Sequence, residues 1–280
     1  MSSHKPIHLF FLLQFMLGVS LVQLGCQKTV EPDPTLLISS QEFDDILKID
    51  GHEFDSLIIE NCTFRGGGLS IGDADNVVVR NCRFEDIRHN GIKVGFTGPA
   101  SDILIEDCFF DGIGFNAIDS HREAPNGTIR GCTIKNAGLS ETGTAMAQPH
   151  HGIYWKGKDV LIEENRFEAG NQPQGNAISV RSSGIVRKNV IIGAPKNGIM
   201  YYSNHPGSDS LLIEHNFLAY NTYGISCATL GNEECHNQNV IIRFKTVLQE
   251  TNYNLYIAAG FQNTTVFSIY GNLFVNPTET

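Results

Sequence analysis

The stretch LIIENCTF at residues 57–64 is the first of nine copies of one pattern along the chain. Each copy has an apolar-x-apolar step, a further residue that is usually charged, a turn residue, then usually Cys or Asn, and an apolar residue two places later. The other copies are VVVRNCRF (77–84), ILIEDCFF (103–110), GTIRGCTI (127–134), VLIEENRF (160–167), GIVRKNVI (184–191), LLIEHNFL (211–218), VIIRFKTV (240–247) and FSIYGNLF (267–274). A repeat of about 20–30 residues without helical periodicity predicts stacked copies of one unit rather than separate domains.

Alignment of the copies defines columns of like residues. The Cys/Asn column and the apolar columns predict short strands with one buried face. The charged column alternates in sign without an error through Glu60, Arg80, Glu106, Arg130, Glu163, Arg187, Glu214 and Arg243. Opposite charges on adjacent strands are favourable and like charges are not. The alternation therefore predicts that each copy lies directly beside the next in a parallel ladder with about 4.8 Å between strands.

A second short strand precedes most copies of the pattern. It reads GLSIG, GIKVG, AIDSH, GIYWK, AISVR, GIMYY, GISCA and NLYIA. With these two strands, the sequence over about 54–274 resembles the right-handed parallel β-helix of the pectin-lyase-like superfamily. The resemblance implies an all-β solenoid of about eight to nine coils. It does not define the activity, because this fold is shared by lyases, hydrolases, epimerases and non-catalytic proteins.

The two ends of the chain differ from the repeat. Residues 1–26 predict a lipoprotein-like export signal with Cys26 as the lipidated residue, and an uncleaved anchor and a plain signal peptide are the alternatives. Residues 27–50 predict a tether and an N-terminal cap, with a short amphipathic helix over 36–48. Residues 51–280 form the predicted β-helix domain. We expect a lipid-anchored protein of the bacterial cell envelope, in the periplasm or outer membrane. The C-terminal end of the repeat shows no cap, so either another subunit covers it or the gene product is shortened.

Composition narrows the partners. The 280 residues carry a net charge of −10, which argues against nucleic acid as a binding partner.

Four cysteines share one inward column and are either small core residues or members of disulfides between neighbouring coils: Cys62, Cys82, Cys108 and Cys132. Cys227 and Cys235 flank a loop and are a second candidate pair. No metal-site spacing is present, and no cofactor is expected; calcium is a weak candidate only.

Candidate site residues lie on the GIxV-type strand, where the groove runs in the fold that the sequence resembles. Its first outward column is Ser70, Lys93, Asp119, Tyr154, Ser179, Met200, Ser226 and Tyr256. Its second is Gly72, Gly95, His121, Lys156, Arg181, Tyr202, Ala228 and Ala258. The large polar side chains gather on the middle coils, as a cleft would require.

The second column contains a basic run, His121, Lys156 and Arg181, with no acid in it. Stacked like charges are costly unless an anion compensates them. The run predicts a site for an elongated anion such as a uronate polysaccharide. The alternative is a solvated face on which the long side chains splay apart.

The longest loop, residues 135–151, ends in two histidines that open the phrase HHGIYW at residues 150–155. The H-G-I-x-apolar phrase resembles the strand that carries the catalytic His of β-helical mannuronan C5-epimerases and the His-Gly motif of polygalacturonases. Paired carboxylates for glycoside hydrolysis are missing. Asp119 matches one calcium-binding position of pectate lyases, but its partners on adjacent coils are absent. His151 is therefore either a catalytic base or a bend residue that replaces the Asn usual at that position.

These residues suggest C5-proton abstraction from a uronate, with β-elimination favoured over epimerisation. His151 would be the base, Tyr154 the proton donor, and Lys156 and Arg181 would neutralise the carboxylate. The substrate-binding candidates are Lys93, Asp119, His121, His150 and Tyr202. The alternative function is a non-catalytic surface lipoprotein that binds or displays glycans, or a structural β-helix with an inert groove.

Overall fold

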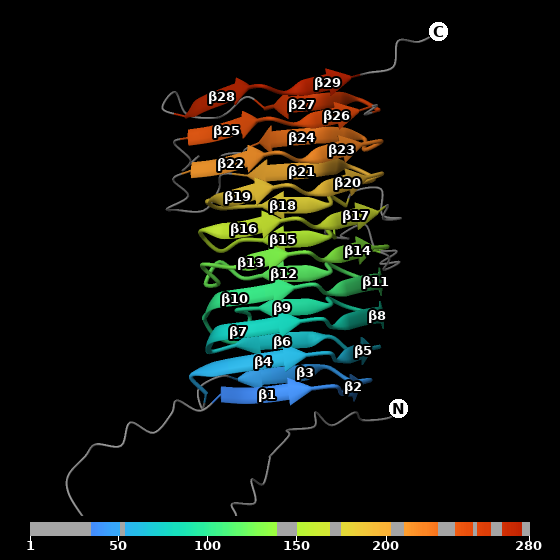
Figure 1. Ribbon diagram of the computed structural model, residues 1–280, viewed down its shortest axis with the longest axis vertical. Helices are drawn as coiled ribbons and strands as arrows, with labels where there is room; N and C mark the ends of the chain where they lie inside the picture. Colours follow the sequence, from blue (N-terminus) through green and yellow to red (C-terminus); the bar gives the residue numbers. More distant parts are fainter. Residues whose placement is uncertain are drawn as a thin grey trace, which may run out of the picture. The chain divides into compact units, whose positions relative to one another are not determined.

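The computed structural model describes residues 35–50, 54–138, 150–168, 175–202, 210–228, 239–248, 251–258 and 265–275. The chain divides into two units, Met1–Pro32 and Asp33–Thr280, and the described residues all belong to the second. In the described residues every regular element is a strand. Successive turns of the chain, here called rungs, lie one above another, and their strands form three parallel sheets (Figure 1). No helix in this part of the chain is long and apolar enough to cross a membrane.

In the described residues each rung contributes one strand to each sheet, except the last, which has strands in the first two sheets only. The first sheet contains β1 (Thr35–Ser39), β4 (Ser56–Glu60), β7 (Ala74–Arg80), β10 (Ala100–Glu106), β13 (Thr128–Arg130), β16 (Val160–Glu163), β19 (Gly184–Arg187), β22 (Ser210–Glu214), β25 (Asn239–Arg243) and β28 (Val266–Tyr270). The second contains β2 (Glu42–Phe43), β5 (Thr63–Arg65), β8 (Arg83–Ile87), β11 (Phe109–Ile113), β14 (Thr133–Lys135), β17 (Arg166–Glu168), β20 (Val190–Ile192), β23 (Phe217–Ala219), β26 (Thr246–Leu248) and β29 (Leu273–Val275). The third contains β3 (Leu47–Asp50), β6 (Leu69–Gly72), β9 (Ile92–Val94), β12 (Ile118–Ser120), β15 (Ile153–Trp155), β18 (Ile178–Val180), β21 (Asn197–Tyr202), β24 (Tyr223–Ala228) and β27 (Tyr253–Ile257).

The predicted helix over 36–48 is wrong, because these residues form the first rung, β1 to β3. Leu36 to Ser39 pair in register with residues 57–60, and Phe43 stacks on Phe64 at 4.9 Å. The segment LLISSQEF is thus another copy of the repeat, in which Ser and Gln replace the charged residue and the Cys/Asn. In the described residues the first rung begins at Thr35, and with it the three sheets contain ten, ten and nine strands.

The charged column has the predicted register. Glu106 is paired with Arg80 on one side and with Arg130 on the other. The side chains contact in twos, each Arg reaching the Glu of the rung before it at 2.6–2.7 Å: Glu60–Arg80, Glu106–Arg130, Glu163–Arg187 and Glu214–Arg243. These pairs are partly exposed, so each contributes little to stability and mainly favours the correct register.

The interior consists of stacks of like side chains. Phe64, Phe84 and Phe110 lie one above another with ring centroids 4.5 and 4.8 Å apart. The turn residue before each Cys/Asn position adopts a positive φ, from Asn61 at 55° to Gly271 at 63°. This left-handed corner aims the next side chain inward.

The Cys/Asn column forms a polar ladder inside the solenoid. Cys62, Cys82, Cys108 and Cys132 are unbridged, and each thiol points at a main-chain carbonyl oxygen. From the next rung on, Asn165 and Asn189 donate and accept along the axis, with Nδ2 of Asn165 3.0 Å from Oδ1 of Asn189. The core interpretation of these cysteines is confirmed. Cys227 is also unbridged, and Cys235 lies outside the described residues.

Lys245 occupies one position of this ladder. It is 1% exposed, and among the described residues its Nζ has no hydrogen-bond partner. Burial holds the pKa of Lys245 well below its usual value. The last rung leaves apolar side chains such as Tyr270, Leu273 and Phe274 exposed. Self-association at that end stays a prediction.

Candidate functional site

The two outward columns of the third sheet have the predicted alignment. Lys93, Asp119, Tyr154 and Ser179 are register partners on β9, β12, β15 and β18. The alignment of the second column is set by main-chain hydrogen bonds between rungs. For example, the His121 N–H donates to Val94 O and the Arg181 N–H donates to Trp155 O. The structure therefore brings the predicted residues of the middle rungs together on one face.

The cations of this face lie against aromatic rings. Arg181 Cζ is 5.2 Å from the Tyr154 ring centroid and 4.1 Å from that of Tyr202. Lys156 Nζ is 4.3 Å from the Tyr154 ring and 4.8 Å from that of Phe96, and Lys93 Nζ also lies over Phe96. Cation–π contact of this kind holds long side chains in place at a solvent-accessible surface. We call the set Lys93, Phe96, His121, Tyr154, Lys156, Arg181 and Tyr202 the cationic row.

An acid does reach the basic run, contrary to the sequence-based expectation. Asp119 Oδ1 accepts from Lys156 Nζ at 2.8 Å, and Asp119 Oδ2 accepts from Asn116 Nδ2 at 3.1 Å. The acid comes from the neighbouring column, one rung away, so alignment within a single column did not reveal it. Asp119 is buried, and its two carboxylate oxygens are engaged by Lys156 and Asn116.

His151 lies at the bend before β15 and is 3% exposed. Its main-chain N–H donates to Asn116 Oδ1 at 2.6 Å, and its Nδ1 accepts from the Asn176 N–H at 3.1 Å. Asn116 in turn donates its N–H to Asn90 Oδ1, so His151 takes the place of an Asn in a ladder of bend residues. Burial, with the nearby positive charge of Arg181, lowers the pKa of His151 to about 3.

Two further predicted residues lie at the margins. His150 stacks on Phe115 with ring centroids 4.4 Å apart, and burial lowers its pKa. His121 packs edge-on against Phe96 and is 3.9 Å from the Glu123 carboxylate. Most of the long loop, residues 139–149, lies outside the described residues.

Tyr154 is the central aromatic residue of the row. Burial raises the pKa of its hydroxyl, while the charge of Arg181 acts in the opposite direction. Its ring contacts His151 edge-on at 5.0 Å. The phenol is thus held between a cation and a neutral imidazole.

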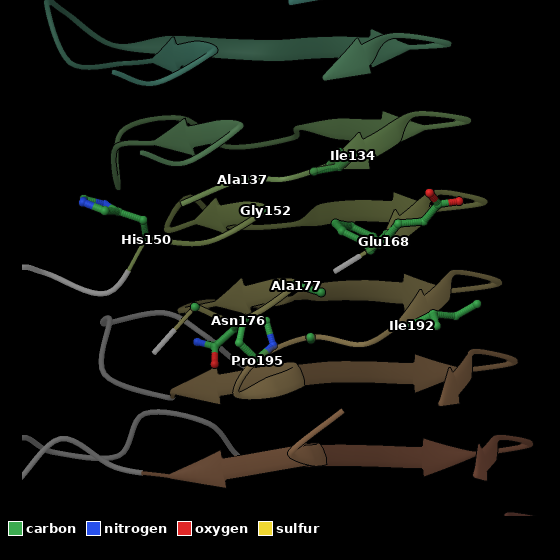
Figure 2. A pocket seen from close by; sticks show the side chains of 12 residues that line it. Ile134, Ala137, His150, Gly152, Glu168, Asn176, Ala177, Ile192 and Pro195 are labelled. Carbon is green, nitrogen blue, oxygen red and sulfur yellow. The ribbon is translucent and has the colours of Figure 1, made fainter. Parts of the chain in front are cut away.

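A small cavity of about 30 Å³ lies at the bend between the second and third sheets, and no residue of the cationic row lines it. Figure 2 shows His150 and Glu168 at opposite ends of it, with Asn176 and Pro195 between them. This volume is of the order of one water molecule, so it does not accommodate a sugar. Within the described residues no group of three or more His, Cys, Asp or Glu is arranged to hold a metal ion.

Sequence reasoning did not identify Phe96 and Asn116 as parts of the site. Phe96 lies just beyond the outward columns, and its ring reaches Lys93 and Lys156 across two rungs. Asn116 belongs to a bend position that is Asn on several coils, and that regularity was the available signal.

Three parallel sheets, each with one strand per rung along most of the axis, define a parallel β-helix. The cationic row lies along the outer face of the third sheet. The sequence matches the family model described as the right handed beta helix region over residues 47–218, which is more than half of the chain. The chain therefore belongs to the right-handed β-helix family. No curated protein has a matching sequence.

Solved structures with the same fold include tailspike proteins of E. coli bacteriophage HK620. A mutant in complex with a pentasaccharide aligns with TM-score 0.53 and 12% identity, covering 87% of this chain and 49% of that one. A double mutant aligns with TM-score 0.57 and 12% identity over 88% and 49%. An exopolygalacturonase from Thermotoga maritima gives TM-score 0.42 and 15% identity over 80% and 56%. The chain spans about half the length of these proteins, and the similarity extends to the fold alone.

Proposed function

We propose that the protein is an exported carbohydrate-active β-helix that acts on an acidic polysaccharide and cleaves it beside a uronate by β-elimination. The observation that carries the proposal is the position of Arg181 against the rings of Tyr154 and Tyr202, on a face that also holds Lys156 and Lys93. An arginine can bind a carboxylate through two parallel hydrogen bonds. The neighbouring rings give the sugar an apolar surface.

The chemistry follows from the acidity of the C5 proton. The adjacent carboxylate opposes carbanion formation, so a site must neutralise it and supply a base. Arg181 would neutralise the carboxylate. Tyr154 Oη, as phenolate, would take the C5 proton and pass it to the leaving O4 oxygen. The C5–H and C4–O bonds break and a C4=C5 double bond forms, with no further reactant.

The geometry favours Tyr154 over His151 as the base. The Nδ1 lone pair of His151 already accepts the Asn176 N–H, so its other ring nitrogen carries the proton. A base with a pKa of about 3 is also a weak one. Because burial raises the pKa of Tyr154, elimination should accelerate as the pH rises toward that pKa.

The test is release of an ultraviolet-absorbing unsaturated product from alginate, pectate and glycosaminoglycans. Arg181→Ala and Tyr154→Phe should abolish the signal. His151→Asn should retain most of it, because Asn occupies the equivalent bend at Asn116 and Asn176. Loss of activity in His151→Asn with an intact fold would return the base role to His151. Absence of product from every substrate would refute the elimination.

A non-catalytic glycan-binding protein is the second candidate. It is favoured by the raised pKa of Tyr154 and the engaged lone pair of His151, which leave little base at neutral pH. This candidate predicts saturable retention on an acidic polysaccharide, lost in Arg181→Ala, without any new double bond.

Export and membrane attachment through Cys26 are part of the proposal and rest on the sequence alone, since residues 1–34 lie outside the described residues. Lipid labelling of the wild type and release of Cys26→Ala from the membrane fraction would support them. Unlabelled wild-type protein would refute the lipid anchor.

A further inference from the structure

The centre of the cationic row is an ion pair rather than an open positive charge. Lys156 and Asp119 are in contact at 2.8 Å, and their side chains are only 17% and 11% exposed. Asn116 donates to the second oxygen of Asp119, so both carboxylate oxygens have donors. A buried pair with its hydrogen bonds satisfied keeps its geometry. A ligand above this rung therefore meets little net charge.

The surroundings of the pair also disfavour an anion. Lys156 Nζ lies 4.3 Å from the ring centroid of Tyr154 and 4.8 Å from that of Phe96. The faces of aromatic rings are electronegative. A substrate carboxylate at this rung would approach two such faces and the Asp119 carboxylate, while the Lys156 charge is already compensated.

The pair lies within the row, with cations on either side of it. Lys93 is the register partner of Asp119 on the preceding rung, and Arg181 follows Lys156 on the next one. Lys93 contacts Phe96, and no ion pair of Lys93 is found within the described residues. The neutral pair thus spans two rungs, with Lys93 on the rung before it and Arg181 on the rung after it.

From this arrangement, which rests on the proposed function, we infer that Asp119 sets the substrate class. The row takes a glycan whose sugar at the Lys156 rung is uncharged. The substrate is then a heteropolysaccharide in which uronates are separated by neutral sugars, rather than a homopolyuronate with a carboxylate on every sugar. Asp119 is a specificity-determining residue that acts through Lys156.

The experiment compares binding of two polymers at equal uronate concentration. Hyaluronan alternates a uronate with a neutral amino sugar, and polygalacturonate carries a carboxylate on every residue. Wild-type protein should bind hyaluronan at least about tenfold more tightly, as expected when one like-charge contact is avoided. Asp119→Asn, which keeps the side-chain shape, should shift the ratio about tenfold toward polygalacturonate by leaving Lys156 uncompensated.

Glu123→Gln is the matched control, because it removes one negative charge beside His121 without touching Lys156. It should leave the ratio unchanged. If Asp119→Asn does not fold, Lys156→Met tests the same pair in the opposite direction. This variant leaves the Asp119 charge uncompensated, so polygalacturonate should bind even more weakly relative to hyaluronan than it does to the wild type.

Wild-type protein that prefers polygalacturonate, or equal shifts in Asp119→Asn and Glu123→Gln, overturns the role of Asp119 and leaves the proposed function standing. Wild-type protein that retains neither polymer overturns this inference; the proposed function is overturned with it only if alginate is also neither bound nor cleaved.

Discussion

Replacing Asn189 by alanine should destabilise the solenoid by about 3 kcal/mol. Its Nδ2 donates to Ile162 O and Asn216 Oδ1, both at 2.9 Å, and its Oδ1 accepts the main-chain N–H and Nδ2–H of Asn165 at 3.0 Å. The substitution leaves the buried Asn165 N–H without an acceptor, which costs about 1–3 kcal/mol. The other lost bonds cost about 0.5–1.5 kcal/mol each, less than additively within one network.

Cys108→Ala is the matched control in the same column. The Cys108 thiol is 3.6 Å from Val79 O and 3.3 Å from Glu106 O, and thiols are weak donors. Its removal should cost about 1 kcal/mol, mostly from lost packing. Urea unfolding followed by far-ultraviolet circular dichroism gives the two midpoints, and equal slopes confirm that the same transition is compared. An Asn189→Ala cost no larger than that of Cys108→Ala would refute the claim that the amide ladder stabilises these rungs.

Three other predictions concern the core. Phe84→Ala should lower the free energy of unfolding by about 3–5 kcal/mol, because its ring is fully buried between two others; Phe109→Ala, on the outer side of the next rung, should cost far less in the same urea titration. Lys245→Asn should stabilise the protein by about 2 kcal/mol at neutral pH by restoring the amide ladder. Burial depresses the pKa of Lys245, so the stability of the wild type falls as the pH drops below about 10.4, the pKa of lysine in the unfolded chain. The stability advantage of Lys245→Asn over the wild type should therefore grow as the pH falls, as urea titrations at several pH values would show. A stability difference that does not change with pH would contradict this. Cys108, buried and with its pKa raised chiefly by its contact with Cys132, should resist iodoacetamide in the native protein and react in urea, as mass spectrometry would show.

Much of the fold could be predicted because a repeat places residues that are distant in sequence at fixed positions on adjacent rungs. The sign alternation of the charged column predicted the pairing of Glu106 with Arg80 and Arg130, which the register confirms. The same alignment brought Tyr154, Lys156 and Arg181 to one face. The first rung escaped detection because Ser39 and Gln41 stand where the pattern expects a charge and a Cys or Asn, and a short apolar segment is equally compatible with a helix or a strand.

The amino-acid sequence by itself determined the solenoid, the inward columns and the face that carries the polar residues, since these follow from periodicity and strand geometry. Only the tertiary structure decided which polar atoms contact one another. The Asp119–Lys156 pair crosses from one column to the next, and the His151 lone pair is taken by a main-chain N–H of another rung. Alignment fixes Cα positions, whereas such contacts depend on side-chain rotamers and bend geometry, and these contacts set the charge and basicity of the site.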